Sequence, residues 1–260
     1  MEPCRFAIVS YHRLKDTAPL DRFCDHLLSA GFRLDEEDPE LVIVLGGDGS
    51  FLRAVHDHDF QGSYLLVNTG HLGFFSDYSL SELRTLHEDI LEKEPTYEEL
   101  PLLSYVSKGE EMFALSDIVL QAEKTIDLSL YLNDRLLCET KTSGIVIGTP
   151  VSSTAYLGSL LAPAIPTLRD VFQYILIAPV RNRLYPNAIE KAVLSKDDIL
   201  EIEVSAGKAS LFLDGMKRDE AIEDSFRIHL VKSPTTKLIH FHDNDNFRRI
   251  LKSVSGIEEE

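Results

Sequence analysis

The segment LVIVLGGDGSFLRAVH, residues 41–56, constrains the fold more than any other part of the chain. Its first five residues, Leu41–Leu45, form an apolar run of the length expected for a buried strand. The run ends directly in the Gly-Gly-Asp-Gly motif of residues 46–49, and an apolar-periodic segment follows. The segment therefore predicts a strand, a glycine-rich turn and a helix in immediate succession.

The rest of the first hundred residues alternates in the same way between short apolar runs, typical of buried strands, and segments whose apolar residues recur at helical spacing. Two further apolar runs, Phe6–Ser10 and Tyr64–Asn68, are expected to be strands. Apolar residues at helical spacing predict one helix after Thr17 and Pro19 that stops at Gly31, with Leu20, Phe23, Leu27 and Leu28 as its apolar positions. A capping-box spacing at residues 79–82 opens a second helix, with Leu83, Leu86, Ile90 and Leu91 on one face. Strands that alternate with helices predict an α/β domain with a parallel sheet.

After Pro95 the pattern changes to the alternation of antiparallel strands. Residues 126–132 alternate, turn at Asn133-Asp134 and return, and residues 199–205 are predicted to form a second hairpin with 209–215. We expect three parts: an α/β domain with the glycine turn at 1–98, a β-rich dinucleotide-binding domain at 99–240, and a C-terminal helix at 241–260. That helix, over residues 245–253, is expected to return to the first domain.

Composition limits the possible partners and location. The net charge of −17 repels polyanions, so we expect neither nucleic acid nor a membrane surface as a partner. The apolar runs are shorter than a membrane span, and the first residues lack the pattern of a signal peptide, which favours the cytoplasm. Three well-separated cysteines argue against a disulfide framework or a cysteine zinc site.

The glycine-rich turn has two possible interpretations, a ligand site and a purely structural turn. In open parallel sheets, ligands bind beyond the carboxyl ends of the strands, and glycines leave room for phosphate against bare backbone N–H groups. Asp48 would then accept a proton from a hydroxyl group or help to hold a magnesium ion. The alternative is a plain strand–helix turn with Asp48 as the helix cap.

Two further segments favour a site. NTGHLGFF, residues 68–75, follows the next predicted strand, so that both glycine turns would lie at the same sheet edge. TPVSSTAY, residues 149–156, follows a strand at 145–147 and carries hydroxyl residues suited to a helix N-terminus, where a cap would use one of Ser152, Ser153 and Thr154. His240 and His242 resemble metal ligands, but a partly exposed strand end is the favoured interpretation.

The motifs GGDG, NTGHLGF and TPxxSTAY, in this order and at these separations, resemble those of the NAD kinase family, particularly the enzymes of Gram-positive bacteria. The resemblance extends from the first strand to Asp214-Gly215 and includes Asn182–Tyr185. GGDG alone is shared with diacylglycerol and sphingosine kinases and loosely with phosphofructokinases, whereas TPxxSTAY is more specific. The resemblance implies phosphorylation of the 2′-hydroxyl of the adenosine ribose of NAD, with ATP as the donor and a divalent cation, magnesium.

The resemblance also implies roles for particular residues. Asp48 would be the catalytic base, with no protein metal ligand assigned. The ligand-binding positions would be Gly46, Gly47, Gly49, Ser50, Phe74, Ser116, Asp117, Thr154, Ala155, Tyr156 and Ser159. It further implies a homodimer or homotetramer in the cytoplasm.

The chain departs from the family pattern at several positions. Ser116-Asp117 replaces Asn-Glu, Thr142-Ser143-Gly144 replaces Gly-Asp-Gly, and Ser152 and Leu161-Ala162 replace glycines. Two alternatives therefore stay open: a dinucleotide-binding sensor that has lost catalysis, and a kinase of another hydroxyl substrate such as a lipid.

Overall fold

The computed structural model describes residues 1–14, 16–70, 73–107, 109–160, 162, 165, 170–185, 189–222 and 226–242. The chain divides into two compact units: Met1–Leu100 with Ser233–Glu260, here called the α/β unit, and Pro101–Lys232, the β unit. Strands β6 (Thr96–Ser107) and β15 (Phe226–His240) contribute residues to both. The helix predicted at residues 245–253 lies outside the described residues.

The α/β unit contains the predicted parallel sheet. Strands β1 (Arg5–Ser10), β3 (Leu41–Leu45) and β4 (Ser63–Asn68) pair side by side in parallel, with the short β2 (Arg33–Leu34) next to β1. The short β5 (Tyr78–Ser79) and the end of β15 pair in parallel with β4. The two strands that precede the glycine turns, β3 and β4, are therefore direct neighbours.

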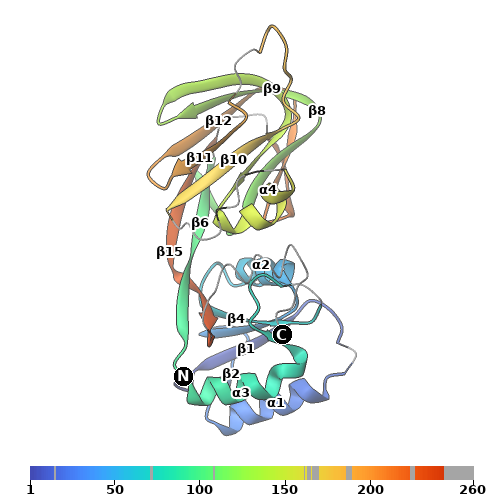
Figure 1. The fold of residues 1–260 in the computed structure, drawn as a ribbon, viewed down its shortest axis with the longest axis vertical. Helices are drawn as coiled ribbons and strands as arrows, with labels where there is room; N and C mark the ends of the chain where they lie inside the picture. Colours follow the sequence, from blue (N-terminus) through green and yellow to red (C-terminus); the bar gives the residue numbers. More distant parts are fainter. Residues whose placement is uncertain are drawn as a thin grey trace. The chain divides into compact units, whose positions relative to one another are not determined.

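Helices cover both faces of this sheet (Figure 1). Helices α1 (Ala18–Ser29) and α3 (Leu83–Glu92) pack on one face, where Phe23 and Leu86 join Ile43 of β3 and Leu65 of β4 in one apolar cluster. Helix α2 (Asp48–Asp57) lies on the other face, where Phe51 contacts the Tyr64 ring, whose side chain alternates with that of Leu65. A strand buried on both faces explains why β3 is apolar throughout.

The predicted boundaries of α1 and α3 are confirmed, but Leu28 and Leu91 do not lie on the buried faces of these helices. Thr17 is the N-cap of α1, and Gly31 follows its end with a φ of +95°. The Glu82 carboxylate accepts a hydrogen bond from the Ser79 backbone N–H at 2.8 Å, ahead of a 3₁₀ turn (η1, Leu80–Glu82) and α3. Leu28 and Leu91 are 43% and 44% exposed, because each lies one residue beyond the buried stripe of its helix.

The β unit is an antiparallel sheet, which confirms the predicted fold class. Its strands follow the spatial order β11-β10-β9-β8-β12-β15. The strands of this unit that have not yet been given are β7 (Glu110–Ala114), β8 (Asp117–Leu132), β9 (Arg135–Gly148), β10 (Val171–Ile177), β11 (Lys191–Ser195), β12 (Ile199–Ala206), β13 (Ala209–Leu213) and β14 (Met216–Ile222). None of the helices in the described part of the chain is long and apolar enough to cross a membrane.

One predicted hairpin of the β unit is confirmed and the other is wrong. β8 and β9 turn at Asn133 and Asp134, which have φ values of 51° and 62°. β12 and β13 do not pair with each other. Both pair antiparallel with β8, one beyond the other, so the chain continues in one direction through Gly207. The hairpin is instead β13–β14, which turns at Asp214-Gly215.

Candidate functional site

The first glycine of the GGDG turn is required by close packing. A Cβ atom at Gly46 would lie 2.2 Å from the Ser50 Oγ atom, and the Gly46 N–H donates a hydrogen bond to the Val67 carbonyl of β4 at 3.0 Å. Gly47 is the N-cap of α2 and offers no side chain. A Cβ atom at Gly49 would meet no other atom within 4 Å, so the turn leaves open space there.

Asp48 joins the two glycine turns. Its Oδ1 and Oδ2 atoms accept hydrogen bonds from the Phe74 backbone N–H at 3.0 and 3.1 Å, and Oδ1 also accepts one from the Phe75 N–H at 3.2 Å. As the first residue of α2, the carboxylate also lies at the positive end of the helix dipole. Asp48 is not the N-cap, so the interpretation of this stretch as a simple capped turn is wrong.

The second turn is built around Asn68. Its Oδ1 atom accepts a hydrogen bond from the Gly70 N–H at 2.9 Å, and a Cβ atom at Gly73 would lie 2.3 Å from Ser76 Oγ and 3.3 Å from Asn68 Nδ2. Phe75 is buried against Phe51, whereas Phe74 is half-buried. Phe74 is therefore the ring of this pair that retains exposed surface, and His71 lies outside the described residues.

The β unit brings Ser116, Asp117 and Ser152 together in one hydrogen-bonded cluster. The hydroxyls of Ser116 and Ser152 both donate to the Asp117 Oδ2 atom, at 3.0 and 2.9 Å. All three residues are buried. The serines thus act inside the protein, as donors that stabilise a buried carboxylate.

Asp214, from the β13–β14 turn, completes this cluster. Its carboxylate accepts hydrogen bonds from the backbone N–H groups of Leu115, Ser116 and Asp117, at 2.8, 2.6 and 3.0 Å. The sequence marks the Asp-Gly pair only as a turn, and no local pattern shows that the aspartate reaches a segment about a hundred residues earlier. Asp214 is the residue of the cluster that sequence reasoning missed.

The ionisation of Asp117 depends on its buried surroundings. Burial raises the pKa of the Asp117 carboxyl to about 6, and the neighbouring Asp214 carboxylate acts in the same direction. The hydroxyls of Ser152 and Ser116 oppose this shift by donating to the charged form. Asp117 therefore titrates close to physiological pH, unlike an exposed aspartate.

The TPVSSTAY segment forms a 3₁₀ turn (η2, Pro150–Thr154) and one short helical turn (α4, Tyr156–Ser159). The N-cap of η2 is Thr149, whose Oγ1 atom accepts from the Val151 N–H at 3.2 Å, so the alternative in which Ser152, Ser153 or Thr154 is the cap does not hold for this turn. Three hydroxyls in the segment donate to carbonyls of their own turn, those of Ser153, Thr154 and Ser159. Ala155, Tyr156 and Ser159 are exposed, and they form the accessible part of this segment.

No group of three or more His, Cys, Asp or Glu side chains among the described residues is arranged to hold a metal ion. His240 is fully buried, contrary to the expected partly exposed strand end. Its Nδ1 and Nε2 atoms lie 2.7 Å from Asp77 Oδ2 and 3.1 Å from Glu98 Oε2. This histidine therefore ties β15 to β6 and to the segment after the second glycine turn.

The two glycine turns follow adjacent parallel strands of the α/β unit, at the sheet edge where α/β proteins commonly bind phosphorylated ligands. Residues 10–95 match the family model of the ATP-NAD kinase N-terminal domain. Across the chain, the NAD kinase of Lactobacillus johnsonii is 25% identical over 248 residues, covering 89% of this chain and 92% of that protein. The NAD kinase of Streptococcus agalactiae is 28% identical and covers 83% of this chain and 85% of that protein. Residues 10–95 are thus similar to the N-terminal domain of that family, and most of the chain is similar to bacterial NAD kinases.

Solved structures show the same fold. Yeast NADH kinase in complex with NADH has a TM-score of 0.81 at 17% identity, covering 99% of this chain and 89% of that one. An NAD kinase from Archaeoglobus fulgidus in complex with ATP has a TM-score of 0.78 at 22% identity, covering 98% of this chain and all of that one (100%). At these identities the two structures support the architecture of the chain.

Proposed function

We propose that this protein is an NAD kinase, which transfers the γ-phosphoryl group of ATP to the 2′-hydroxyl of the adenosine ribose of NAD and releases NADP and ADP. Asp48 is the proposed base. The hydroxyl oxygen forms the new bond to phosphorus, its proton passes to the Asp48 carboxylate, and the bond between the γ-phosphorus and the bridging oxygen of ADP breaks.

The fixed position of the Asp48 carboxylate is the observation that carries this proposal. Backbone N–H groups of Phe74 and Phe75 hold it between two glycine turns. Both turns follow strands whose carboxyl ends lie together, the usual place for a ligand in a parallel sheet. Phosphoryl transfer depends chiefly on positioning and charge neutralisation, so a base fixed in this way is suited to receive the hydroxyl proton.

The neighbouring residues receive complementary roles. The bare backbone at Gly46, Gly47 and Gly49, with Ser50, is proposed to approach the phosphates, and half-buried Phe74 to contact the adenine ring. In the β unit, we assign Thr154, Ala155, Tyr156 and Ser159 to the dinucleotide. Ser116 and Asp117 are assigned to the same pocket through the hydrogen-bonded cluster that they form with Ser152.

The ligands follow from the family and from the solved relatives, which bind NADH in one case and ATP in the other. A magnesium ion would neutralise phosphate charge when ATP is bound. Such ions keep several water ligands and bind substrate phosphates, and we assign no protein side chain as a ligand. We further propose a cytoplasmic location and a homodimer or homotetramer.

The decisive test incubates the purified protein with NAD, ATP and Mg²⁺ and measures NADP in a dehydrogenase-coupled assay. We expect Asp48→Asn to lower kcat by about 10²- to 10⁴-fold, the usual contribution of a general base. Asp25→Asn, which neutralises an exposed carboxylate on α1, is the matched control and should retain full activity. NADP formation that is equal in the two variants would exclude Asp48 as the base.

The same assay separates the alternatives. Tight NADP binding in calorimetry without any NADP formation would identify a sensor rather than an enzyme. Transfer of labelled phosphate to lipid extracts but not to NAD would identify a kinase of another hydroxyl substrate.

A further inference from the structure

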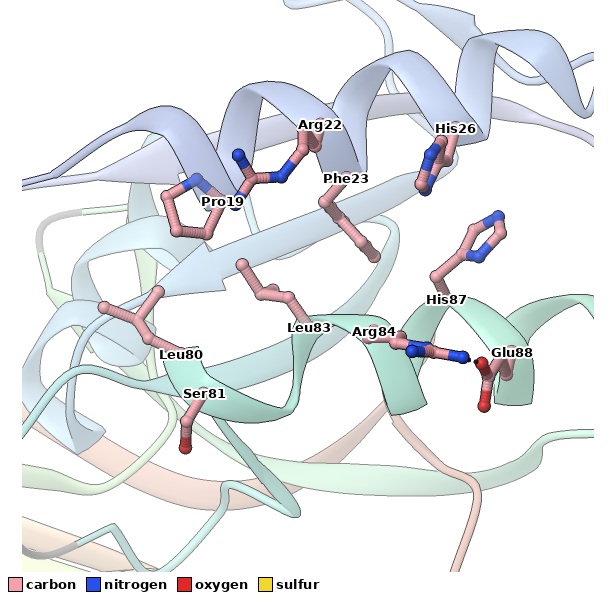
Figure 2. Close-up of a pocket in the computed structure, with 10 residues that line it drawn as sticks. All are labelled: Pro19, Arg22, Phe23, His26, Leu80, Ser81, Leu83, Arg84, His87 and Glu88. Carbon is pink, nitrogen blue, oxygen red and sulfur yellow. Dashed lines mark hydrogen bonds and ion pairs between the residues drawn. The ribbon is translucent and has the colours of Figure 1, made fainter.

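A cavity of about 700 Å³ lies between α1 and α3 on the outer surface of the α/β unit. Figure 2 shows that its lining side chains come from these two helices and from the 3₁₀ turn before α3. Because α1 and α3 cover one face of the sheet and α2 the other, this cavity is on the face opposite the helix that begins with Asp48.

The charge of the cavity is opposite to that of the protein. Arg22 and His26 line it from α1, and Arg84 and His87 from α3, with Glu88 as the one acidic residue among the lining side chains. The chain as a whole carries a net charge of −17. Two guanidinium groups against one carboxylate give the cavity a net positive charge, which favours an anion on a surface that otherwise repels anions.

The internal contacts of the two arginines leave their guanidinium groups accessible to a ligand. Arg22 is exposed and has no ion-pair partner among the residues that the structure describes. The Arg84 Nε–H donates a hydrogen bond to the Glu88 carboxylate at 3.0 Å. Because both side chains are exposed, breaking this ion pair to bind a ligand costs little free energy. Guanidinium groups offer several N–H donors in a planar fork that matches the oxygen atoms of a phosphate group.

The two histidines face each other across the cavity, with ring centroids 4.9 Å apart. Burial and the neighbouring His26 hold the pKa of the His87 ring below its ordinary value. Two facing imidazoles repel each other when both are protonated, and a bound anion removes that cost. The charged or titratable groups around the pair are Arg22 on α1 and Arg84 and Glu88 on α3.

Apart from Ser81, the rest of the lining is apolar. Phe23 and Leu83 are buried residues that form part of the cavity wall, beside Leu80 and Pro19. A cavity of this size with an apolar wall and a few polar groups is typical of a site for a small organic molecule. The basic groups would take its charged end and the apolar wall its carbon skeleton.

We propose that the cavity between α1 and α3 binds an organic phosphate, with Arg22, Arg84, His26 and His87 around the phosphate group. This site is separate from the glycine turns and is independent of the proposed kinase reaction. It is also a different kind of site, because it uses side-chain cations where the turns offer backbone N–H groups.

The test follows the imidazole ring protons of His26 and His87 by NMR, assigned with His26→Gln and His87→Gln, while phenyl phosphate is added without NAD or ATP. We expect both resonances to shift in a saturable way, and the affinity to be higher at mildly acidic pH. Inorganic phosphate is expected to bind more weakly than phenyl phosphate, because it cannot use the apolar wall. Equal affinity for the two probes would remove the organic part of the proposal.

The matched variants are Arg22→Gln, inside the cavity, and Arg33→Gln, which removes the same charge from β2 outside it. We expect Arg22→Gln to weaken binding about tenfold or more, the effect of losing a hydrogen bond to a charged group, and Arg33→Gln to leave it unchanged. Unshifted histidine resonances at saturating phosphate, or equal weakening by the two variants, would overturn the proposal. Since no substrate of the kinase reaction is present, either result leaves the proposed function untouched.

Discussion

The Ser152 hydroxyl donates a hydrogen bond to the Asp117 carboxylate at 2.9 Å, across 35 residues of the chain. Both side chains are buried in one cluster. Their contributions to stability are therefore expected to depend on each other.

This coupling predicts a non-additive double-mutant cycle. At about pH 8, Ser152→Ala should destabilise the protein by about 1.5–3 kcal/mol, because it removes a hydrogen bond to a buried charged group. In the Asp117→Asn background the same change should cost less, since the remaining acceptor is neutral. Chemical denaturation of the four proteins measures the difference, which is expected to exceed about 0.5 kcal/mol. Ser153→Ala is the control, because Ser153 donates to the Pro150 carbonyl.

Asp117 also predicts how stability depends on pH. Burial raises its pKa from 3.8 to about 6, so the folded state binds the proton more tightly than the unfolded state. Stability from this group is fully present below about pH 4 and falls as the pH rises towards 6, by about 3 kcal/mol in all. We expect Asp117→Asn to gain stability over the wild type across this window, as measured by denaturation at several pH values. A difference between the two proteins that does not change with pH would contradict the assigned shift.

The local part of the fold could be predicted from the sequence, because its determinants lie within a few residues. The apolar run of β3, the glycines after it and the Ser79–Glu82 box each act on their own segment. The errors arose where a choice depends on distant partners. The alternation at 199–205 is that of a strand, but it does not reveal that β12 pairs with β8 and β15 instead of β13.

In the candidate site, too, local features could be predicted from the sequence and contacts between distant segments could not. The position of Asp48 after a buried strand follows from the sequence, whereas its hydrogen bonds to Phe74 and Phe75 depend on β3 and β4 being neighbours. Asp214 could not be predicted as part of a cluster, since it reaches Leu115 and Ser116 only through the pairing of β13 with β8.

The glycine turn predicts opposite effects of alanine at two of its positions. Gly46→Ala should destabilise the protein by about 1–3 kcal/mol, because the new methyl group would overlap Ser50, whose Oγ and Cβ atoms lie 2.2 and 2.4 Å from its position. At Gly49 there is open space for a methyl group, and the residue lies within α2. The stability of the Gly49→Ala protein should therefore equal or slightly exceed that of the wild type. Thermal unfolding compares the two. If Gly49 faces the phosphates as proposed, Gly49→Ala should raise the KM for ATP while the protein remains fully folded.

Replacing His240 is expected to lower the stability of the protein more than replacing His242. The buried His240 ring contacts Asp77 through one nitrogen and Glu98 through the other, and so joins three segments of the α/β unit. Glutamine can reach only one of these carboxylates, so His240→Gln should lower the free energy of unfolding by about 1–3 kcal/mol. The His242 side chain is 46% exposed and lies 3.5 Å from Asp89, so His242→Gln should change it by less than about 0.5 kcal/mol. Denaturant titrations compare the two variants, and equal losses would show that the His240 contacts contribute no more than the contact of His242 with Asp89.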